Sequence, residues 1–163
     1  MTTSQTLAEV TDNTRDLLYF YLSKIDKSLW YETPELDGII FNSVAWELCH
    51  MVWAQDFLIL RACANRSSEI VWLQKFEIGK AAANSSELPP IDEIKAALKS
   101  VHTQSLEVIK LLSDDDLKTP NHVNLDFKKG KDKLQIIYHH IRHEGGHIGH
   151  IGLLCKLFGV KTI

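Results

Sequence analysis

Apolar residues recur at three- and four-residue steps along most of this 163-residue chain, which is the spacing of one face of an α-helix. Four such stretches are long, and they cover residues 4–29, 39–64, 91–112 and 131–158. No stretch has a convincing strand pattern, although residues 123–127 are expected to include a short extended piece. Because each helix must bury its apolar face against another element, the periodicity predicts an all-α protein built as a four-helix bundle.

The connection between the second and third helices limits how the helices can be ordered. It runs over residues 65–90, contains a candidate short helix near residues 69–78, and stops at Pro89 and Pro90. Such a long crossover lets the second and third helices lie parallel, which allows an up-down-down-up order. With 45% apolar and 24% charged residues the chain can bury one core, so we expect a single domain over residues 1–163.

The composition argues against several partners and locations. The 18 basic and 21 acidic residues give a net charge of −3 and form no basic run, which disfavours nucleic-acid and membrane partners. No run reaches the length of about 18 apolar residues that a membrane span needs, and the first residues lack a signal-peptide pattern. Because Cys49, Cys63 and Cys155 show no CxxC spacing, we expect reduced thiols and a cytoplasmic protein.

Five of the eight histidines lie within one short stretch of the fourth helix, HHIRHEGGHIGH. His139, His143 and His147 follow one another at four-residue steps, and His150 comes three residues later. At about 100° per residue, these four project from one helical stripe about 80° wide. Imidazole is the commonest metal ligand near neutral pH, because it is largely uncharged there. The pattern predicts a metal site.

A facing helix must complete such a site, and His50 in the second helix is the candidate. It shares an otherwise apolar face with Trp46 and Phe57, where an unsatisfied polar group costs about 1–3 kcal/mol. We therefore predict that His50, His143 and His147 bind one divalent metal, zinc or nickel, with manganese or iron as alternatives. Three imidazoles with one open position resemble the ligand sets of catalytic zinc sites.

Each histidine also has a simpler interpretation. A lone histidine on an apolar face is usually a hydrogen-bonded core residue, and many pairs at four-residue spacing are merely solvated. His102 on the inward face of the third helix is a reserve ligand, while His139 and His140 are weaker candidates and His122 is expected in a loop. Arg61, about three turns beyond His50, either holds an anionic group or extends to solvent.

The segment from His143 to His147 also spells HExxH, the signature of zinc proteases, in which the glutamate is the general base. We disfavour a protease, because the residues after His150 include no Asp, Glu or His to act as a third ligand. Glu144 is rotated by about 100° from His143, so it either supports the site or faces solvent. The glycines roughly opposite the histidines are expected to pack against a helix or a second subunit: Gly145, Gly149 and Gly152.

Two blocks of this sequence resemble a known family. DKLQIIYHHIRHEGGHIGHIGLL resembles the last-helix signature of the DinB/YfiT-like superfamily, and SVAWELCHMVW resembles its Trp-x-x-x-His signature in the second helix. By position, the metal-binding histidines of the family fall on His50, His143 and His147. One departure is that Ile148, Gly149 and His150 replace the usual Arg-Gly-Gln.

The resemblance implies an up-down-down-up bundle that is often a homodimer and binds zinc or nickel. It also implies a small-molecule substrate, since relatives include S-transferases that use low-molecular-weight thiols, a maleylpyruvate isomerase and suggested hydrolases. A transferase would use the metal to present the thiol as thiolate. A hydrolase would use it to activate water, with Glu144 or His150 as the catalytic proton acceptor.

Three functions therefore remain open: a thiol-dependent S-transferase, a metal-dependent hydrolase, and a non-catalytic binding protein that the metal stabilises. We favour the transferase, because the predicted ligands include no carboxylate and would leave the metal its full charge for a thiolate. Trp46, Trp53 and Phe57 are expected to wall an apolar pocket for the acceptor.

Overall fold

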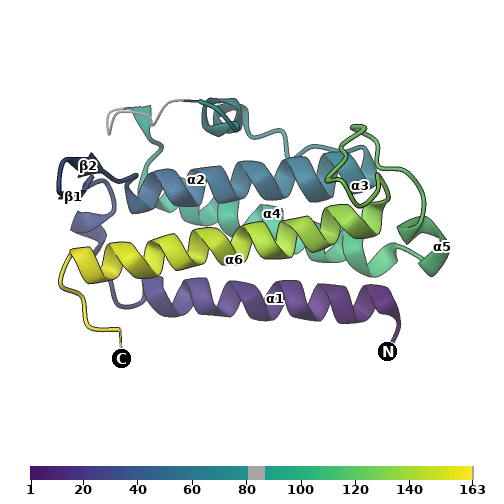
Figure 1. The fold of residues 1–163 in the computed structure, drawn as a ribbon, viewed down its shortest axis with the longest axis horizontal. Coiled ribbons are helices and arrows are strands. Elements are labelled where there is room, and N and C mark those ends of the chain that lie inside the picture. The colour runs from purple at the N-terminus through teal and green to yellow at the C-terminus, as the bar shows by residue number, and fades with distance from the viewer. Residues whose placement is uncertain (81–86, 163) are drawn as a thin grey trace.

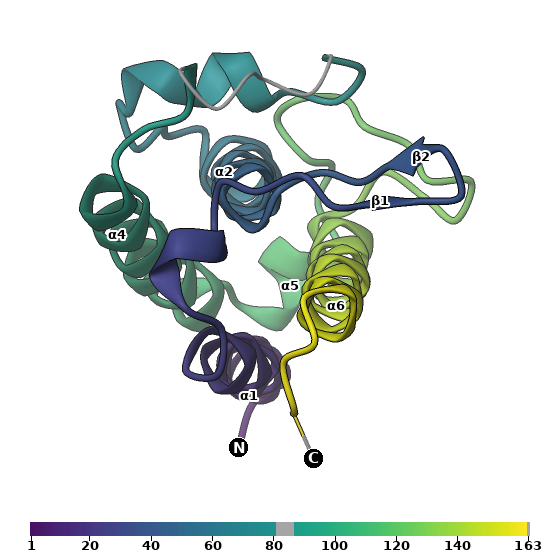
Figure 2. The ribbon, with the colours of Figure 1, turned by 90° about the vertical axis from the view of Figure 1, so that its left-hand side faces the viewer.

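Four long helices make up most of the computed structural model, which describes residues 1–80 and 87–162 (Figure 1). They are α1 (Thr3–Leu22), α2 (Val44–Gln55), α4 (Ile91–Leu111) and α6 (Lys133–Leu157). Both α1 and α2 pack against α4 and α6, and in Figure 2 α1 lies across from α2 with the other two on either side. The all-α prediction is confirmed.

Short elements connect the long helices. The turn η2 (Asp56–Arg61) and α3 (Ala62–Ala64) extend α2, while the others are η1 (Lys27–Leu29), β1 (Glu35–Leu36), β2 (Ile39–Ile40), η3 (Val71–Phe76) and α5 (Asp114–Leu117). The short helix expected near residues 69–78 is η3. Residues 81–86 of the long connection lie outside the described residues. The extended piece expected at 123–127 is not a strand, and the nearest pairing is an isolated bridge between Pro120 and Asp132.

Polar side chains decide where the first two helices begin and end. Helix α1 stops at Leu22 rather than continuing to residue 29, because the Asp26 side chain accepts a hydrogen bond from the Ser28 amide and starts η1 instead. The predicted start of the second helix at residue 39 is also wrong. Asp37 and Gly38 have φ angles of 50° and 79° and turn the chain into the β1–β2 hairpin. Helix α2 begins only at Val44, after its N-cap Ser43.

The helical hydrogen-bond pattern widens to a π-helix at Asp56–Arg61. A π-turn brings residues five apart onto the same face. As a result the Arg61 Nε donates to Asp56 Oδ2 over 2.7 Å. The Asp56 side chain is fully buried, so this contact gives its carboxylate a charged partner. The extra residue in this turn explains why α2 and its extension do not follow one uninterrupted α-helical stripe from His50 to Arg61.

The core between the four helices is mainly apolar, although Arg15 and Glu144 are buried there as well. Its largest fully buried side chains include Leu18, Leu48, Ile59, Leu98 and Ile109. The three cysteines are buried and form no disulfide, as expected from their spacing. Among the described residues, no helix combines the length and the hydropathy that crossing a membrane requires.

Candidate metal centre

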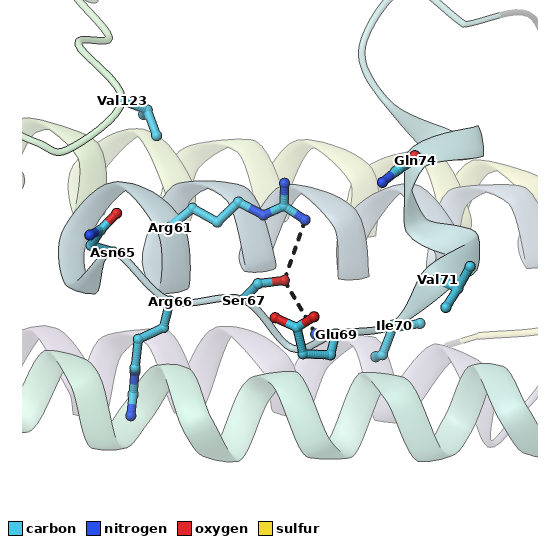
Figure 3. Close-up of a pocket in the computed structure, with 9 residues that line it drawn as sticks. All are labelled: Arg61, Asn65, Arg66, Ser67, Glu69, Ile70, Val71, Gln74 and Val123. Carbon is cyan, nitrogen blue, oxygen red and sulfur yellow. Dashed lines mark hydrogen bonds between the residues drawn. The ribbon is translucent and has the colours of Figure 1, made fainter.

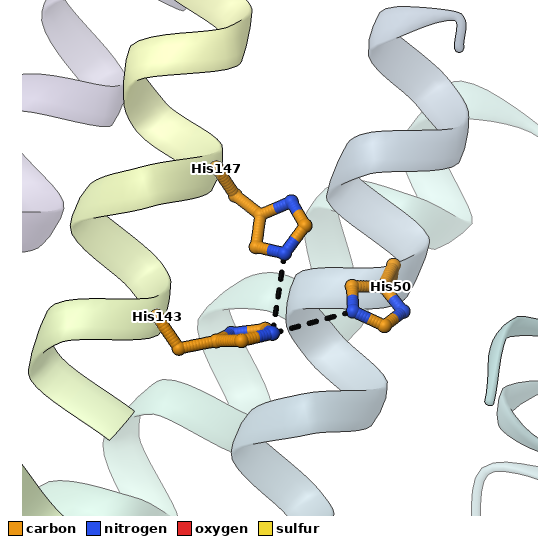
Figure 4. Close-up of side chains that lie close together, drawn as sticks. All are labelled: His50, His143 and His147. Carbon is orange, nitrogen blue, oxygen red and sulfur yellow. Dashed lines mark hydrogen bonds between the residues drawn. The ribbon is translucent and has the colours of Figure 1, made fainter. Parts of the chain in front are cut away.

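The three histidines predicted as ligands come together between α2 and α6. His143 and His147 lie one turn apart on α6, and His50 faces them from α2 (Figure 4). The Nε2 atom of His143 lies 3.4 Å from Nε2 of His50 and 3.2 Å from Nε2 of His147. One nitrogen of each ring lies within 4.8 Å of the other two, which is close enough for all three to share a metal ion.

The partners of the Nδ1 atoms identify the tautomers of His50 and His147. His50 Nδ1 lies 2.7 Å from the carbonyl oxygen of Phe76, and His147 Nδ1 lies 2.5 Å from a carboxylate oxygen of Glu47. Both oxygens accept hydrogen bonds, so both Nδ1 atoms carry the proton and donate it. In the neutral rings, the lone pairs of the two Nε2 atoms then face His143.

This donor set fits a divalent cation. Bonds of about 2.0–2.1 Å from zinc to nitrogen place neighbouring ligand nitrogens about 3.3–3.4 Å apart in a tetrahedral site. The observed separations from His143, 3.2 and 3.4 Å, are close to that spacing. Without a cation, a proton on His143 could serve only one of the two facing lone pairs at a time.

Burial keeps the rings in the form that a metal needs. The pKa of His143 is lowered to about 3, mainly by desolvation and then by the neighbouring rings of His147 and His50. Burial is also the main reason that the pKa of His50 is lowered. Both rings are therefore neutral at neutral pH, with a lone pair available for coordination.

Glu47 is the residue that sequence reasoning missed. It is buried, accepts hydrogen bonds from His147 and from the Asn42 amide, and lies 3.6 Å from Nδ1 of His150. Burial acts to raise the pKa of Glu47, but the hydrogen bond and charge of His147, together with Asn42 and His150, outweigh it and lower the pKa. A carboxylate that accepts from a ligand histidine fixes the tautomer and orients the ring.

Glu47 corrects the expectation that no carboxylate belongs to this site. One oxygen of Glu47 and one nitrogen each of His147 and His150 also lie within 4.8 Å of one another, so a second ligand group shares His147 with the first. A signal was present in the sequence, because Glu47 is the only Asp, Glu, Lys or Arg in SVAWELCHMVW and lies three positions before His50.

The variant Glu47→Gln is expected to weaken metal binding by about 10- to 100-fold, the usual effect of losing a carboxylate that orients a ligand histidine. Gln keeps the size and one acceptor oxygen but lacks the negative charge. Competition with a chelator of known affinity measures the change. The exposed Glu107 on α4 supplies the control, Glu107→Gln, which should bind as the parent does. Equal affinity in Glu47→Gln and the parent would contradict the role given to Glu47.

The structure does not bring Glu144 to the cluster of His50, His143 and His147. Its side chain is 3% exposed and accepts a hydrogen bond from Arg15 Nε over 2.6 Å, while His140 lies 3.3 Å from its second oxygen. Burial acts to raise the pKa of Glu144, but the charge of Arg15 leads the effects that lower it. Glu144 is thus an ionised residue of the core. His150, by contrast, lies beside the site with 62% of its side chain exposed.

The remaining histidines have other partners. His102 Nε2 donates to the Asp12 carboxylate over 2.9 Å, and its Nδ1 accepts from the amide nitrogen of Gln55 over 3.1 Å. Gln55 also accepts from Arg15 over 2.9 Å, so these residues form one buried network with Glu144 and His140. His139 stacks on Phe127, and His122 is an exposed residue between α5 and α6. None of these four histidines joins a metal-ligand group among the described residues.

A pocket of about 400 Å³ opens beside His147. Of the three aromatic residues expected to wall it, only Trp46 does so, because Trp53 is largely buried and stacks on Phe57. The hairpin and α6 supply the other apolar walls in their place. The lining residues are Ile40, Phe41, Asn42, Trp46, Glu47, His147, His150, Leu153 and Leu154.

Arg61 opens onto a different, polar pocket of about 610 Å³ at the far end of α2 (Figure 3). The side chain of Arg61 is 38% exposed, and its guanidinium donates to Asp56 and lies 3.5 Å from the hydroxyl of Ser67. The anionic group that Arg61 holds is therefore a carboxylate of this chain. The pocket is separate from the histidines and shares no lining residue with the pocket beside His147.

Both the fold and the sequence of this chain have relatives among known proteins and structures. No protein with a curated description matches the chain. A solved structure described as a conserved protein from Enterococcus faecalis superposes with a TM-score of 0.74 at 14% identity, over 96% of this chain and 97% of that one. At this identity the likeness concerns the fold alone. The model of the DinB superfamily matches residues 11–151, which include all three clustered histidines. This chain therefore belongs to the DinB superfamily.

Proposed function

We propose that this protein binds a divalent cation, zinc or nickel, through His50, His143 and His147, and that it is a thiol-dependent S-transferase for small electrophiles. The observation that carries the proposal is the convergence of three Nε2 atoms, with the rings of His50 and His147 each held at Nδ1 by an acceptor. A cation there would lower the pKa of a bound thiol and favour the thiolate, which is the nucleophilic form.

The residues around the histidines suit the proton transfer that this reaction needs. His150 lies 3.6 Å from Glu47 with its side chain mostly exposed. With Nδ1–H directed at the Glu47 carboxylate, Nε2 of His150 can accept the thiol proton, and Glu47 stabilises the resulting imidazolium. The thiol sulfur then attacks the electrophilic carbon of the acceptor, and the leaving group departs with the electron pair of the broken bond. The apolar pocket beside His147 is the place for the acceptor.

The transferase is tested by assaying metal-loaded protein with monochlorobimane, with and without bacillithiol, glutathione, mycothiol or cysteine. We expect one thiol to give metal-dependent conjugation. The variant His150→Asn should lower kcat by about 100-fold, the lower range for loss of a general base, while metal content is unchanged. The exposed His122 supplies the control, since His122→Asn should keep the parent rate. Conjugation by none of these thiols would contradict the proposal.

A metal-dependent hydrolase is the second candidate, because a buried carboxylate paired with an exposed imidazole also suits a general base acting on water. Glu47 and His150 would supply that base, since Glu144 is occupied in the core. Cleavage of simple esters or amides in the absence of thiol would favour this reading. If neither conjugation nor cleavage occurs, the protein is better described as a binding protein that the metal stabilises.

The same proposal includes an architecture and an assembly. We infer an up-down-down-up bundle in one domain, which is supported by the ribbon: α1 and α6 run in one direction and α2 and α4 in the other (Figure 1). A homodimer is supported by two glycines of α6. A Cβ at Gly152 would lie 3.0 Å from Tyr21, but a Cβ at Gly145 or Gly149 would meet nothing within 4 Å among the described residues.

A further inference from the structure

A third pocket is lined by residues of α1, η1 and α4, whereas the clustered histidines lie on α2 and α6. Figure 2 shows α4 and α6 on opposite sides of the bundle. The volume of the pocket is about 410 Å³. The end of α1, the turn η1 and the first half of α4 form it. The lining residues are Tyr19, Leu22, Ser23, Lys27, Trp30, Lys95, Leu98 and Lys99.

Three lysines surround this pocket and no carboxylate lines it within the described part of the chain. The pKa of Lys95 is lowered first by desolvation and next by the charge of Lys27, against a smaller opposing effect of Asp92. The ammonium groups of Lys27 and Lys95 are therefore close to each other. The Lys95 ammonium also lies 5.2 Å from the centre of the Trp30 ring. Like charges repel, so this arrangement is stabilised by an anion between them.

Helix dipoles do not explain why these lysines gather here. The C-terminal end of α1 favours a cation such as Lys27. Lys95 and Lys99, however, lie in the N-terminal half of α4, where the dipole favours anions. Nor do the lysines form an ion pair with any carboxylate among residues 1–80 and 87–162.

The floor of the pocket is apolar, and the buried indole of Trp30 is part of it. Trp30 is 1% exposed and Leu98 is 2% exposed, with the half-buried Leu22 beside them. The indole Nε1 of Trp30 is buried and has no hydrogen-bond partner in the described structure. Lysines that only face solvent would not surround a pocket with an apolar floor.

We propose that this pocket binds a small organic anion with an apolar body, of the aromatic carboxylate class. The ring packs on Leu22, Trp30 and Leu98, and the carboxylate lies among the ammonium groups of Lys27, Lys95 and Lys99. A volume of about 410 Å³ is in the range of pockets for small ligands. The site is separate from the proposed metal centre, so it does not depend on the transferase activity.

Titration with 2-naphthoate, followed by calorimetry and by the indole N–H resonance of Trp30, tests this site. We expect saturable binding that shifts this resonance. The triple variant Lys27→Gln, Lys95→Gln, Lys99→Gln should bind about tenfold more weakly, since it loses three charge contacts. The matched control removes the same charge from exposed lysines outside the pocket: Lys75→Gln, Lys110→Gln, Lys129→Gln. The control variant should bind as the parent does.

A neutral ligand of the same shape separates charge recognition from simple apolar binding. We expect 2-naphthamide to bind at least about tenfold more weakly than 2-naphthoate and to be insensitive to the lysine substitutions. Equal binding of the two ligands overturns the proposal, as does a triple variant that binds 2-naphthoate as tightly as the parent. Absence of 2-naphthoate binding at millimolar concentration overturns it too. The metal content of the triple lysine variant should equal that of the parent. A change in 2-naphthoate binding then reports on the lysine pocket and not on the metal centre.

Discussion

Replacing His50, His143 and His147 together by alanine is expected to abolish stoichiometric binding of a divalent cation. The parent, purified without nickel affinity, should contain about one metal per chain, because His143 Nε2 lies at the spacing of a tetrahedral site from the Nε2 atoms of His50 and His147. Loss of a carboxylate behind a ligand already weakens binding by about 10- to 100-fold, so loss of all ligands should exceed that. Elemental analysis measures the content, and chelator competition measures the affinity.

The control for this experiment changes histidines that lie outside the cluster. His122 and His139 are both exposed or half-exposed and belong to no ligand group, so His122→Ala, His139→Ala should keep its metal. Helical circular dichroism checks that each variant folds. A triple variant that folds and still holds about one metal per chain would refute the ligand assignment.

The variant Arg15→Met is expected to lower the free energy of unfolding by about 3–5 kcal/mol, because it leaves the charge of Glu144 buried with only the neutral ring of His140 beside it. Arg15 is 1% exposed and Glu144 3% exposed, so water cannot replace the lost contact. For a chain of this size the loss corresponds to a fall in Tm of roughly 6–20 °C. Thermal and urea unfolding followed by circular dichroism measure it.

The double variant Arg15→Met, Glu144→Leu should recover most of this loss, since apolar side chains of similar volume replace a buried ion pair at little cost. The exposed pair of Lys118 and Asp115 is the comparison, and Lys118→Met should change stability by no more than about 1 kcal/mol. If Arg15→Met were as mild as Lys118→Met, the buried pair would not have the structural role that we give it.

The helices and the three clustered histidines could be predicted from sequence because both depend on local spacing. His143 and His147 are four residues apart, and four residues return a helix to nearly the same face. His50 could be added because an imidazole on an apolar face needs a partner. The boundaries were harder, since Asp26 and the Asp37–Gly38 turn end or delay helices by side-chain and backbone conformations that apolar periodicity does not record.

The role of Glu144 could not be read in the same way. The HExxH pattern places it next to a ligand, but one residue along a helix turns the side chain by about 100° and here directs it into the core. Its partner Arg15 lies 129 positions away in the sequence. Glu47 is the opposite case, since its partner His147 is 100 positions away and only the fold brings them together. Contacts of this kind carry no local signal.

Because the histidines lie on two helices, a bound metal would couple metal supply to folding. His50 and His143 are 93 positions apart in the chain, so a cation shared by their nitrogens closes a long loop and binds the folded chain far better than the unfolded one. Above its dissociation constant, each tenfold rise in free metal then adds about 1.4 kcal/mol to the free energy of unfolding. The abundance of the protein in a cell would accordingly follow the concentration of free metal, with scarcity leaving a chain that opens and is degraded more readily.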